Sequence, residues 1–151
     1  MTPLGFFRKK KEPEKKREEK KPKSTGLSLL ERLCGDDTEL LTVLNHTVLI
    51  DPARLRDEGM DFYLKRAEGF EKGKDLLRAR INYQAAGELA LYEGKLKQAQ
   101  KFFKKCEELE SNPEYKKIFA YFSKKVDAEK ALKAAQEYYS QTAKLSGKME
   151  A

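Results

Sequence analysis

The chain has 151 residues, of which 38% are charged and 39% hydrophobic, with no tryptophan and a formal net charge of +7. This composition is typical of one domain built from helices with charged outer faces. No apolar run approaches the roughly 18 residues that a membrane-spanning helix needs, and no apolar signal region follows the basic start. Cys34 and Cys106 lie far apart without metal-ligand spacing, so we expect reduced thiols and a cytoplasmic protein.

Residues 1–24 carry most of the net charge. They hold ten Lys or Arg and four Glu, whereas the other 127 residues hold 22 basic and 21 acidic side chains. From Arg8 to Lys23 the only apolar side chains are prolines, so we expect a disordered tail ahead of one helical domain at 25–151.

The tail predicts contact with a polyanion or a membrane, because two phenylalanines precede a run of cations. The phenylalanines could stack on RNA bases while the cations pair with phosphates. They could also enter a bilayer surface while the cations meet anionic lipid. A third interpretation is a solubilising terminus without a ligand. The residues expected to make either contact are Phe6, Phe7, Arg8, Lys9, Lys10, Lys11, Lys15, Lys16 and Arg17.

Two short helices are predicted at the start of the domain. Ser28-Leu29-Leu30-Glu31 has the pattern of a capping box, and Gly35 would end the helix that follows it. Asp36 or Asp37 would cap a second helix that ends near His46. His46 is the only histidine, so the sequence lacks the residues for a histidine-based metal site or a catalytic triad. We expect its ring at the C-terminus of a helix.

Asp51-Pro52 predicts the start of a helix that continues to about Lys72, because the carboxylate can serve as N-cap and proline suits the first turn. Asp75 would cap the next, longer helix. The side chains expected on the buried stripe of the helix after Pro52 are Leu55, Phe62, Tyr63, Ala67 and Phe70.

The stretch from Arg80 to Pro113 predicts a helical hairpin. Two helical patterns, each with one apolar stripe, are separated by Gly94. The aromatic, small and turn positions of the stretch are Tyr83, Gly87, Gly94, Ala99, Phe103, Cys106 and Pro113. On these residues the stretch resembles a tetratricopeptide repeat, a resemblance that implies stacked helix pairs and the binding of a partner protein.

A degenerate second hairpin follows at an offset of 32 residues. Tyr115 would take the place of Tyr83, and Val126 the place of Gly94, with Asp127 capping the last helix. We therefore expect an all-α protein of stacked antiparallel helix pairs, either a superhelix of tetratricopeptide type or a compact helical bundle.

The hairpin also predicts a protein-binding surface from polar residues outside its apolar stripes. Lys97 and Lys101 lie one turn apart and could hold a carboxylate. The full set is Asn82, Gln84, Lys97, Gln98 and Lys101.

The predicted function is a non-enzymatic adaptor that binds another protein or peptide segment and uses its basic tail on a polyanion. No cluster of nucleophile, acid and base occurs at mechanistic spacing, so no catalysis, metal or cofactor is expected. The alternatives are an RNA- or ribosome-associated protein, and a peripheral membrane protein anchored by Phe6-Phe7 and the adjoining cations.

Overall fold

The computed structural model describes residues 25–48 and 52–150, with side chains described for 29–48 and 52–144. All regular elements in this part of the chain are helices and none is a strand, which confirms the all-α prediction. The basic segment 1–24 lies outside the described residues. In chain order the elements are α1 (Thr25–Cys34), α2 (Thr38–Thr47), α3 (Pro52–Glu58), α4 (Met60–Lys72), α5 (Leu76–Glu93), α6 (Leu96–Leu109), α7 (Pro113–Ala120), the 3₁₀ turn η4 (Tyr121–Ser123) and α8 (Lys125–Glu150).

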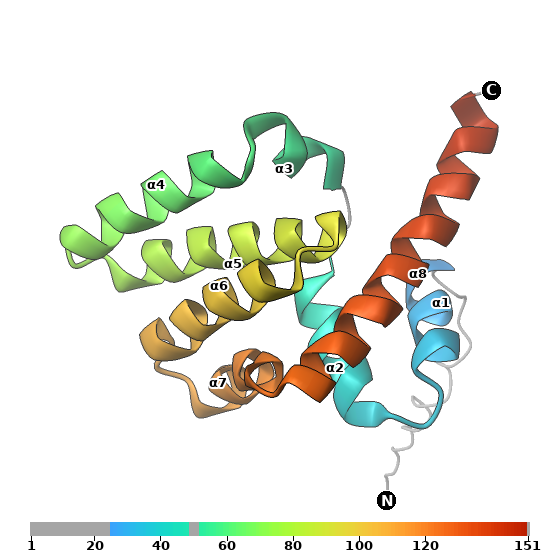
Figure 1. The fold of residues 1–151 in the computed structure, drawn as a ribbon, viewed down its shortest axis with the longest axis horizontal. Coiled ribbons are helices and arrows are strands. Elements are labelled where there is room, and N and C mark those ends of the chain that lie inside the picture. The colour runs from blue at the N-terminus through green and yellow to red at the C-terminus, as the bar shows by residue number, and fades with distance from the viewer. Residues whose placement is uncertain (1–24, 49–51, 151) are drawn as a thin grey trace, which may run out of the picture.

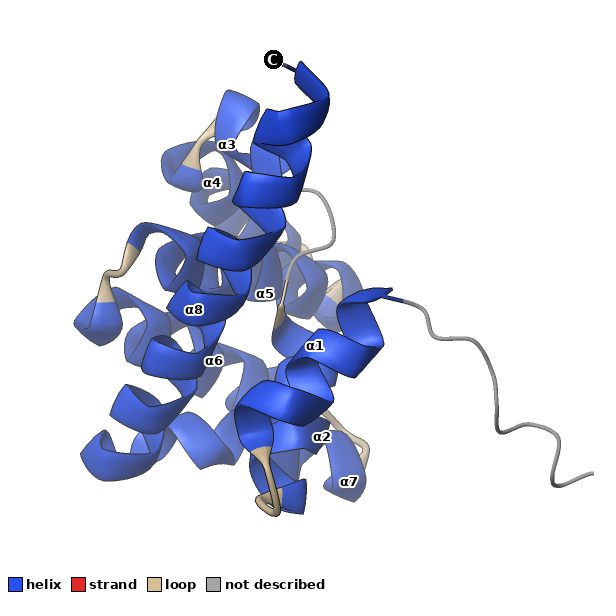
Figure 2. Cartoon of the chain, turned by 90° about the vertical axis from the view of Figure 1, so that its right-hand side faces the viewer, coloured by secondary structure: helices blue, strands red, loops and turns tan. Residues whose placement is uncertain are grey.

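The helices pack in antiparallel pairs. Helices α4, α5 and α6 lie side by side, with α7 next to α6 (Figure 1). The long helix α8 runs along one side of this layer, and α1 packs against α8, as the turned view also shows (Figure 2). The predicted hairpin is therefore present as α5 and α6, and it occupies the middle of the body.

Several predicted helix ends are confirmed by their capping contacts. The Asp37 carboxylate accepts a hydrogen bond from the Leu40 backbone amide at 3.0 Å, and Asp75 accepts one from the Arg78 amide at 3.2 Å. Gly94 ends α5 in the left-handed conformation, at φ +77°. These ends are set by local chemistry, which explains why the sequence predicts them.

Two predictions about the first helices were wrong. Helix α1 begins at Thr25, so Ser28 lies inside the helix and is not its N-cap. The helix predicted from Pro52 to Lys72 is divided into α3 and α4 by Gly59, whose φ of +93° is incompatible with helix.

The stripe predicted on this segment is also less buried than expected. Only Ala67 is fully buried, and Phe62 is 39% exposed. The break at Gly59 gives α3 and α4 separate orientations, so one straight stripe cannot face the core along both helices. The remaining members, Leu55, Tyr63 and Phe70, are partly buried.

The core is centred on Phe103 of α6, which is fully buried. Its ring stacks on Phe122 with centroids 4.3 Å apart and on Phe119 with centroids 6.0 Å apart. On the other side the ring lies against Gly87 of α5. The glycine at this helix contact therefore meets an aromatic ring and permits the close packing of α5 and α6.

The second hairpin differs from the prediction. Tyr115, aligned with the buried Tyr83, is exposed. Helix α7 ends at Ala120 and continues as the turn η4, and α8 already begins at Lys125, so Asp127 lies in its first turn and does not cap it. The eight-residue α7 is too short to reproduce the long first arm of the preceding hairpin.

The α1–α2 pair packs across α7 and α8. Leu44 is fully buried, and Lys130 of α8 forms an ion pair with Asp37 at 3.0 Å. Cys34 and Cys106 are both buried, and they form no disulfide with each other. Burial raises the pKa of both thiols above the ordinary range, so both are protonated at neutral pH.

Candidate functional site

A groove between α2 and α7 is the candidate site. Its volume of about 370 Å³ lies within the range of ligand pockets in proteins. One wall comes from α2 and the other from α7, and the apolar part of the lining exceeds the polar part. The lining residues are Glu39, Thr42, Val43 and His46 from α2, and Glu114, Tyr115, Lys117 and Ile118 from α7.

A smaller recess of about 160 Å³ adjoins this groove. It shares His46, Tyr115 and Ile118 with the groove and adds Phe119 of α7. Arg80 and Gln84 of α5 form its polar side. The two spaces together connect the exposed surface of α2 and α7 with the central hairpin.

Two aromatic rings stand where the groove meets the recess. The Nδ1 atom of His46 lies 2.9 Å from the backbone oxygen of Thr42, so Nδ1 carries a hydrogen and, in the neutral ring, Nε2 is an acceptor. The centroids of the His46 and Tyr115 rings are 5.8 Å apart. Tyr115 is nevertheless 44% exposed, so one of its faces is available to a ligand.

The side of the recess formed by α5 is a polar network. Arg80 Nε lies 2.9 Å from a carboxylate oxygen of Glu110, and both side chains are largely buried. The Arg80 guanidinium also donates to the Gln84 side-chain oxygen. The Gln84 amide nitrogen donates to the backbone oxygen of His46 at 3.0 Å and to Glu88 at 2.7 Å. This network ties the end of α2 to the hairpin.

Glu88 at the inner end of the network has a strongly altered acidity. Burial raises the pKa of its carboxyl to about 8, while the hydrogen bond from Gln84 and the charge of Arg80 act in the opposite direction. The carboxyl is therefore mostly protonated at neutral pH. The ion pair of Arg80 is with Glu110 instead.

The face of α5 that contributes to the recess continues beyond it as an apolar strip formed by Leu77 and Ile81. Leu77, Ile81, Gln84 and Glu88 recur at helical spacing and share one face of α5. The end of that face with Gln84 meets α2, whereas Leu77 is 63% exposed and Ile81 48% exposed. Isolated exposed apolar residues are ordinary, but two on one helical stripe beside a groove favour a binding surface.

The structure does not bring the predicted protein-binding residues together. Asn82 is buried and bridges α5 and α4, since it accepts from Arg66 Nε at 3.3 Å and donates to the Arg78 backbone oxygen at 2.9 Å. Gln84 belongs to the recess. The other three, Lys97, Gln98 and Lys101, are exposed on α6.

The groove residues were not singled out by sequence reasoning. His46 was expected only at a helix C-terminus, where it does lie, in the last turn of α2. Tyr115 was expected in the core, because its register matched that of Tyr83. The groove depends on the packing of α2 against α7, two helices about 70 residues apart, and no local pattern reports that contact.

The described part of the chain contains neither a metal-binding cluster nor a membrane-spanning helix. Over 29–48 and 52–144, where side chains are described, no group of three or more His, Cys, Asp or Glu side chains could hold a metal ion. No helix within 25–48 and 52–150 is long and apolar enough to cross a bilayer. The predicted tail contacts, Phe6 to Arg17, lie outside the described residues.

Comparisons of the chain with protein-family models, with curated proteins and with solved structures gave no match. The geometry of the groove and the distribution of charge therefore carry the functional argument.

Proposed function

We propose that this protein is a non-enzymatic adaptor whose groove between α2 and α7 binds a short segment of another protein. The observation that carries the proposal is the groove itself, because Val43, Ile118 and the exposed ring of Tyr115 line it. The adjoining recess reaches Gln84 of α5, whose helical face continues to the exposed Ile81 and Leu77. Helical hairpins of tetratricopeptide type, which α5 and α6 resemble, serve in partner binding.

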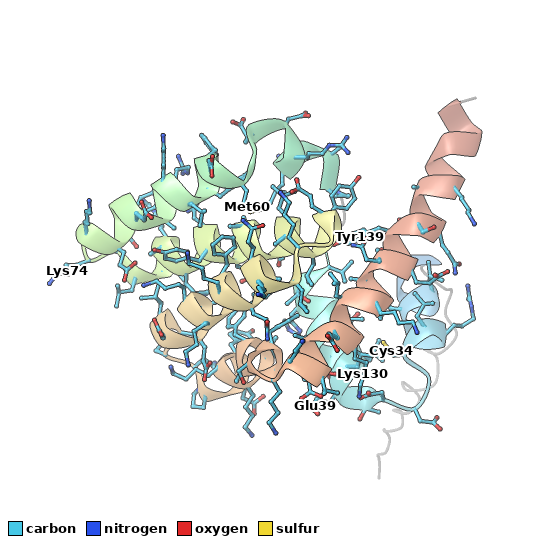
Figure 3. The ribbon with its side chains drawn as sticks, in the orientation of Figure 1. Cys34, Glu39, Met60, Lys74, Lys130 and Tyr139 are labelled. Carbon is cyan, nitrogen blue, oxygen red and sulfur yellow. The ribbon has the colours of Figure 1, made fainter. Side chains whose placement is uncertain are left out.

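The charges of the groove define the chemistry of the segment. Glu39 and Glu114 place a carboxylate on each wall, against a single cation at Lys117. Glu39 projects from the lower edge of the molecule near Lys130, so the acidic end of the groove is at the surface (Figure 3). The expected ligand therefore has an apolar side chain for the space near Tyr115 and a basic side chain beside it.

The basic segment 1–24 has a separate role in this proposal. Its net charge of +6 gives salt-sensitive affinity for a polyanionic surface near the partner. Because the segment and the groove belong to one chain, binding of the segment raises the effective concentration of the groove at that surface.

Selection of peptides from a display library by the full chain tests the groove. Selected peptides are expected to share an apolar residue next to Lys or Arg. Tyr115→Ala and Glu114→Lys should each weaken their binding at least tenfold, whereas Glu129→Lys, a matched charge reversal on α8, should not. Peptides that bind all three variants equally, or a library that yields no binder, would contradict the proposal.

A further inference from the structure

The folded body is nearly neutral as a whole, but its charge is divided between its two halves. Residues 25–94 contain nine basic and 13 acidic side chains, whereas residues 95–151 contain 13 basic and eight acidic side chains. The first part therefore has a net charge of −4 and the second +5. Such a separation gives the surface of the second part a positive potential that the total charge conceals.

Three of the 13 basic side chains of the second part form a row on the outer face of α6. Lys97, Lys101 and Lys104 are exposed there and follow one another at intervals of four and three residues. Because the helical rise is about 1.5 Å per residue, their attachment points form a line with steps of roughly 5–6 Å. Among the described residues, none of the three ammonium groups has an ion-pair partner.

Lys105, on the same helix, has a structural role. Its ammonium group lies 3.0 Å from Glu71 of α4 and 5.3 Å from the centre of the Tyr83 ring. It thus joins three helices. The lysines of the outer face make no comparable contact with described side chains, so stability does not account for their presence.

The start of α8 extends the same face. Gln100 lies within the row on α6, and its amide nitrogen donates to the backbone oxygen of Phe122 at 3.0 Å. This bond holds the η4 turn against α6, and the exposed Lys124 and Lys125 follow directly. Lys125 has only a distant, exposed contact with Glu129 at 4.0 Å. We call Lys97, Lys101, Lys104, Lys124 and Lys125 the lysine face.

We propose that the lysine face binds the phosphodiester backbone of a nucleic-acid duplex. A line of unpaired point charges on a convex helix matches a linear array of phosphates. Stacking of unpaired bases needs exposed aromatic rings, and insertion into a bilayer needs a group of exposed apolar side chains. Of the large apolar side chains exposed in the described part of the chain, only Val126 adjoins this face, so both of those ligands fit it less well.

This inference goes beyond the adaptor proposal and does not depend on it. The groove is built by α2 and α7, and none of its lining residues belongs to the lysine face. Contacts to the phosphodiester backbone do not distinguish one base from another. Binding is therefore expected to be independent of the nucleotide sequence and strongly dependent on salt.

The test uses the full chain and a fluorescent RNA duplex, with affinity measured by anisotropy over a series of salt concentrations. One variant combines Lys97→Gln, Lys101→Gln and Lys104→Gln. The control combines Lys65→Gln, Lys72→Gln and Lys144→Gln, which removes the same charge from α4 and from the far part of α8. The segment 1–24 is present in every protein, so its contribution is constant.

The lysine-face variant is expected to lower the slope of log affinity against log salt by about 2–3, since each lost phosphate contact removes a little under 1. The control should change the slope by less than about 1. Equal slopes for the two variants would overturn the proposal. Absence of duplex binding by the full chain would also overturn it. The same holds if the lysine-face variant retains its affinity for the duplex but loses binding to phosphatidylserine vesicles.

A second measurement needs no substitution. Acetylation of surface amines is followed by mass spectrometry with and without the duplex. Lys97, Lys101 and Lys104 should be protected by the duplex, while Lys65 and Lys72 should not. Unchanged acetylation of the first three would contradict the proposal even if the variants behaved as expected. Circular dichroism of each variant confirms that its helices are intact.

Discussion

The ring of Phe103 occupies the space that a side chain on Gly87 would need. A Cβ atom built on Gly87 would lie 2.9 Å from two ring atoms of Phe103, closer than Cβ atoms approach in real proteins. The ring cannot retreat, because Phe122 and Phe119 stack against it. The separation of α5 and α6 is thus set by the absence of a side chain at one position.

Gly87→Ala should therefore destabilise the protein by about 1–3 kcal/mol, because overpacking outweighs the better helix propensity of alanine. Gly69→Ala in α4 is the matched control, since no atom lies within 4 Å of the Cβ that it would add. This control should stabilise the protein by about 0.5–1 kcal/mol. Denaturant unfolding of both variants measures the difference, and a shift in the same direction for both would refute the packing argument.

Glu88 should make stability fall as the pH rises. Its pKa is about 8 in the folded protein and has an ordinary value of 4.5, so between these values the folded state retains a proton that the unfolded state has lost. The free energy of unfolding therefore decreases over this window and levels off above it. Glu88→Gln keeps the shape and an acceptor for Gln84, and it should flatten the pH dependence of the melting temperature between about 5 and 8. An unchanged profile would show that Glu88 ionises normally.

Glu71 should have the opposite pH dependence. The Lys105 ammonium and the Tyr83 hydroxyl both donate to its carboxylate, and these bonds lower the pKa of Glu71 below its ordinary value. The resulting stability is present above the ordinary pKa and is lost as the pH falls through the lowered pKa. Glu71→Gln should cost about 1 kcal/mol or less at neutral pH, because the pair is partly exposed, and nothing in strong acid.

The control for this substitution is Glu108→Gln, whose carboxylate lies 4.0 Å from Lys105 and is more exposed. It should leave the melting temperature unchanged at every pH. Equal effects of the two substitutions would mean that Lys105 is stabilised by charge alone and not by the specific bond to Glu71.

Deletion of residues 1–24 should leave the melting temperature and the circular dichroism of the body nearly unchanged, because the described core residues, from Leu30 to Tyr139, already form one packed cluster. The same deletion should lower the salt dependence of binding to a polyanion, since it removes a net charge of +6. Thermal melts and anisotropy with the full chain as reference measure both effects. A large loss of stability would show that the segment packs on the body.

The elements that the sequence predicted well are those with local causes. Gly94 ends a helix because its own conformation is left-handed, and Asp37 and Asp75 begin helices through their own carboxylates. By contrast, Gly59 and Gly69 look alike in sequence, yet one breaks the chain into two helices and the other lies within α4. Tertiary packing decides between such glycines, so the break was missed.

The candidate site was harder to predict for the same reason. Tyr83 and Tyr115 occupy equivalent places in the repeat pattern, but Tyr83 meets Glu71 on α4 whereas Tyr115 faces His46 on α2. Asn82 looked like a free polar residue, yet it is used between two helices. Polar side chains on a helix have the same appearance in sequence whether they contact water, a partner or Arg66.

The ion pair between Asp37 and Lys130 joins residues that are 93 positions apart. At a synthesis rate of about 5–20 residues per second, α2 leaves the ribosome on the order of ten seconds before its partner helix α8 is complete. During that interval Leu40, Val43 and Leu44 lack much of the surface that buries them in the finished fold. A nascent chain would therefore present the apolar face of α2 partly uncovered until α8 has been synthesised.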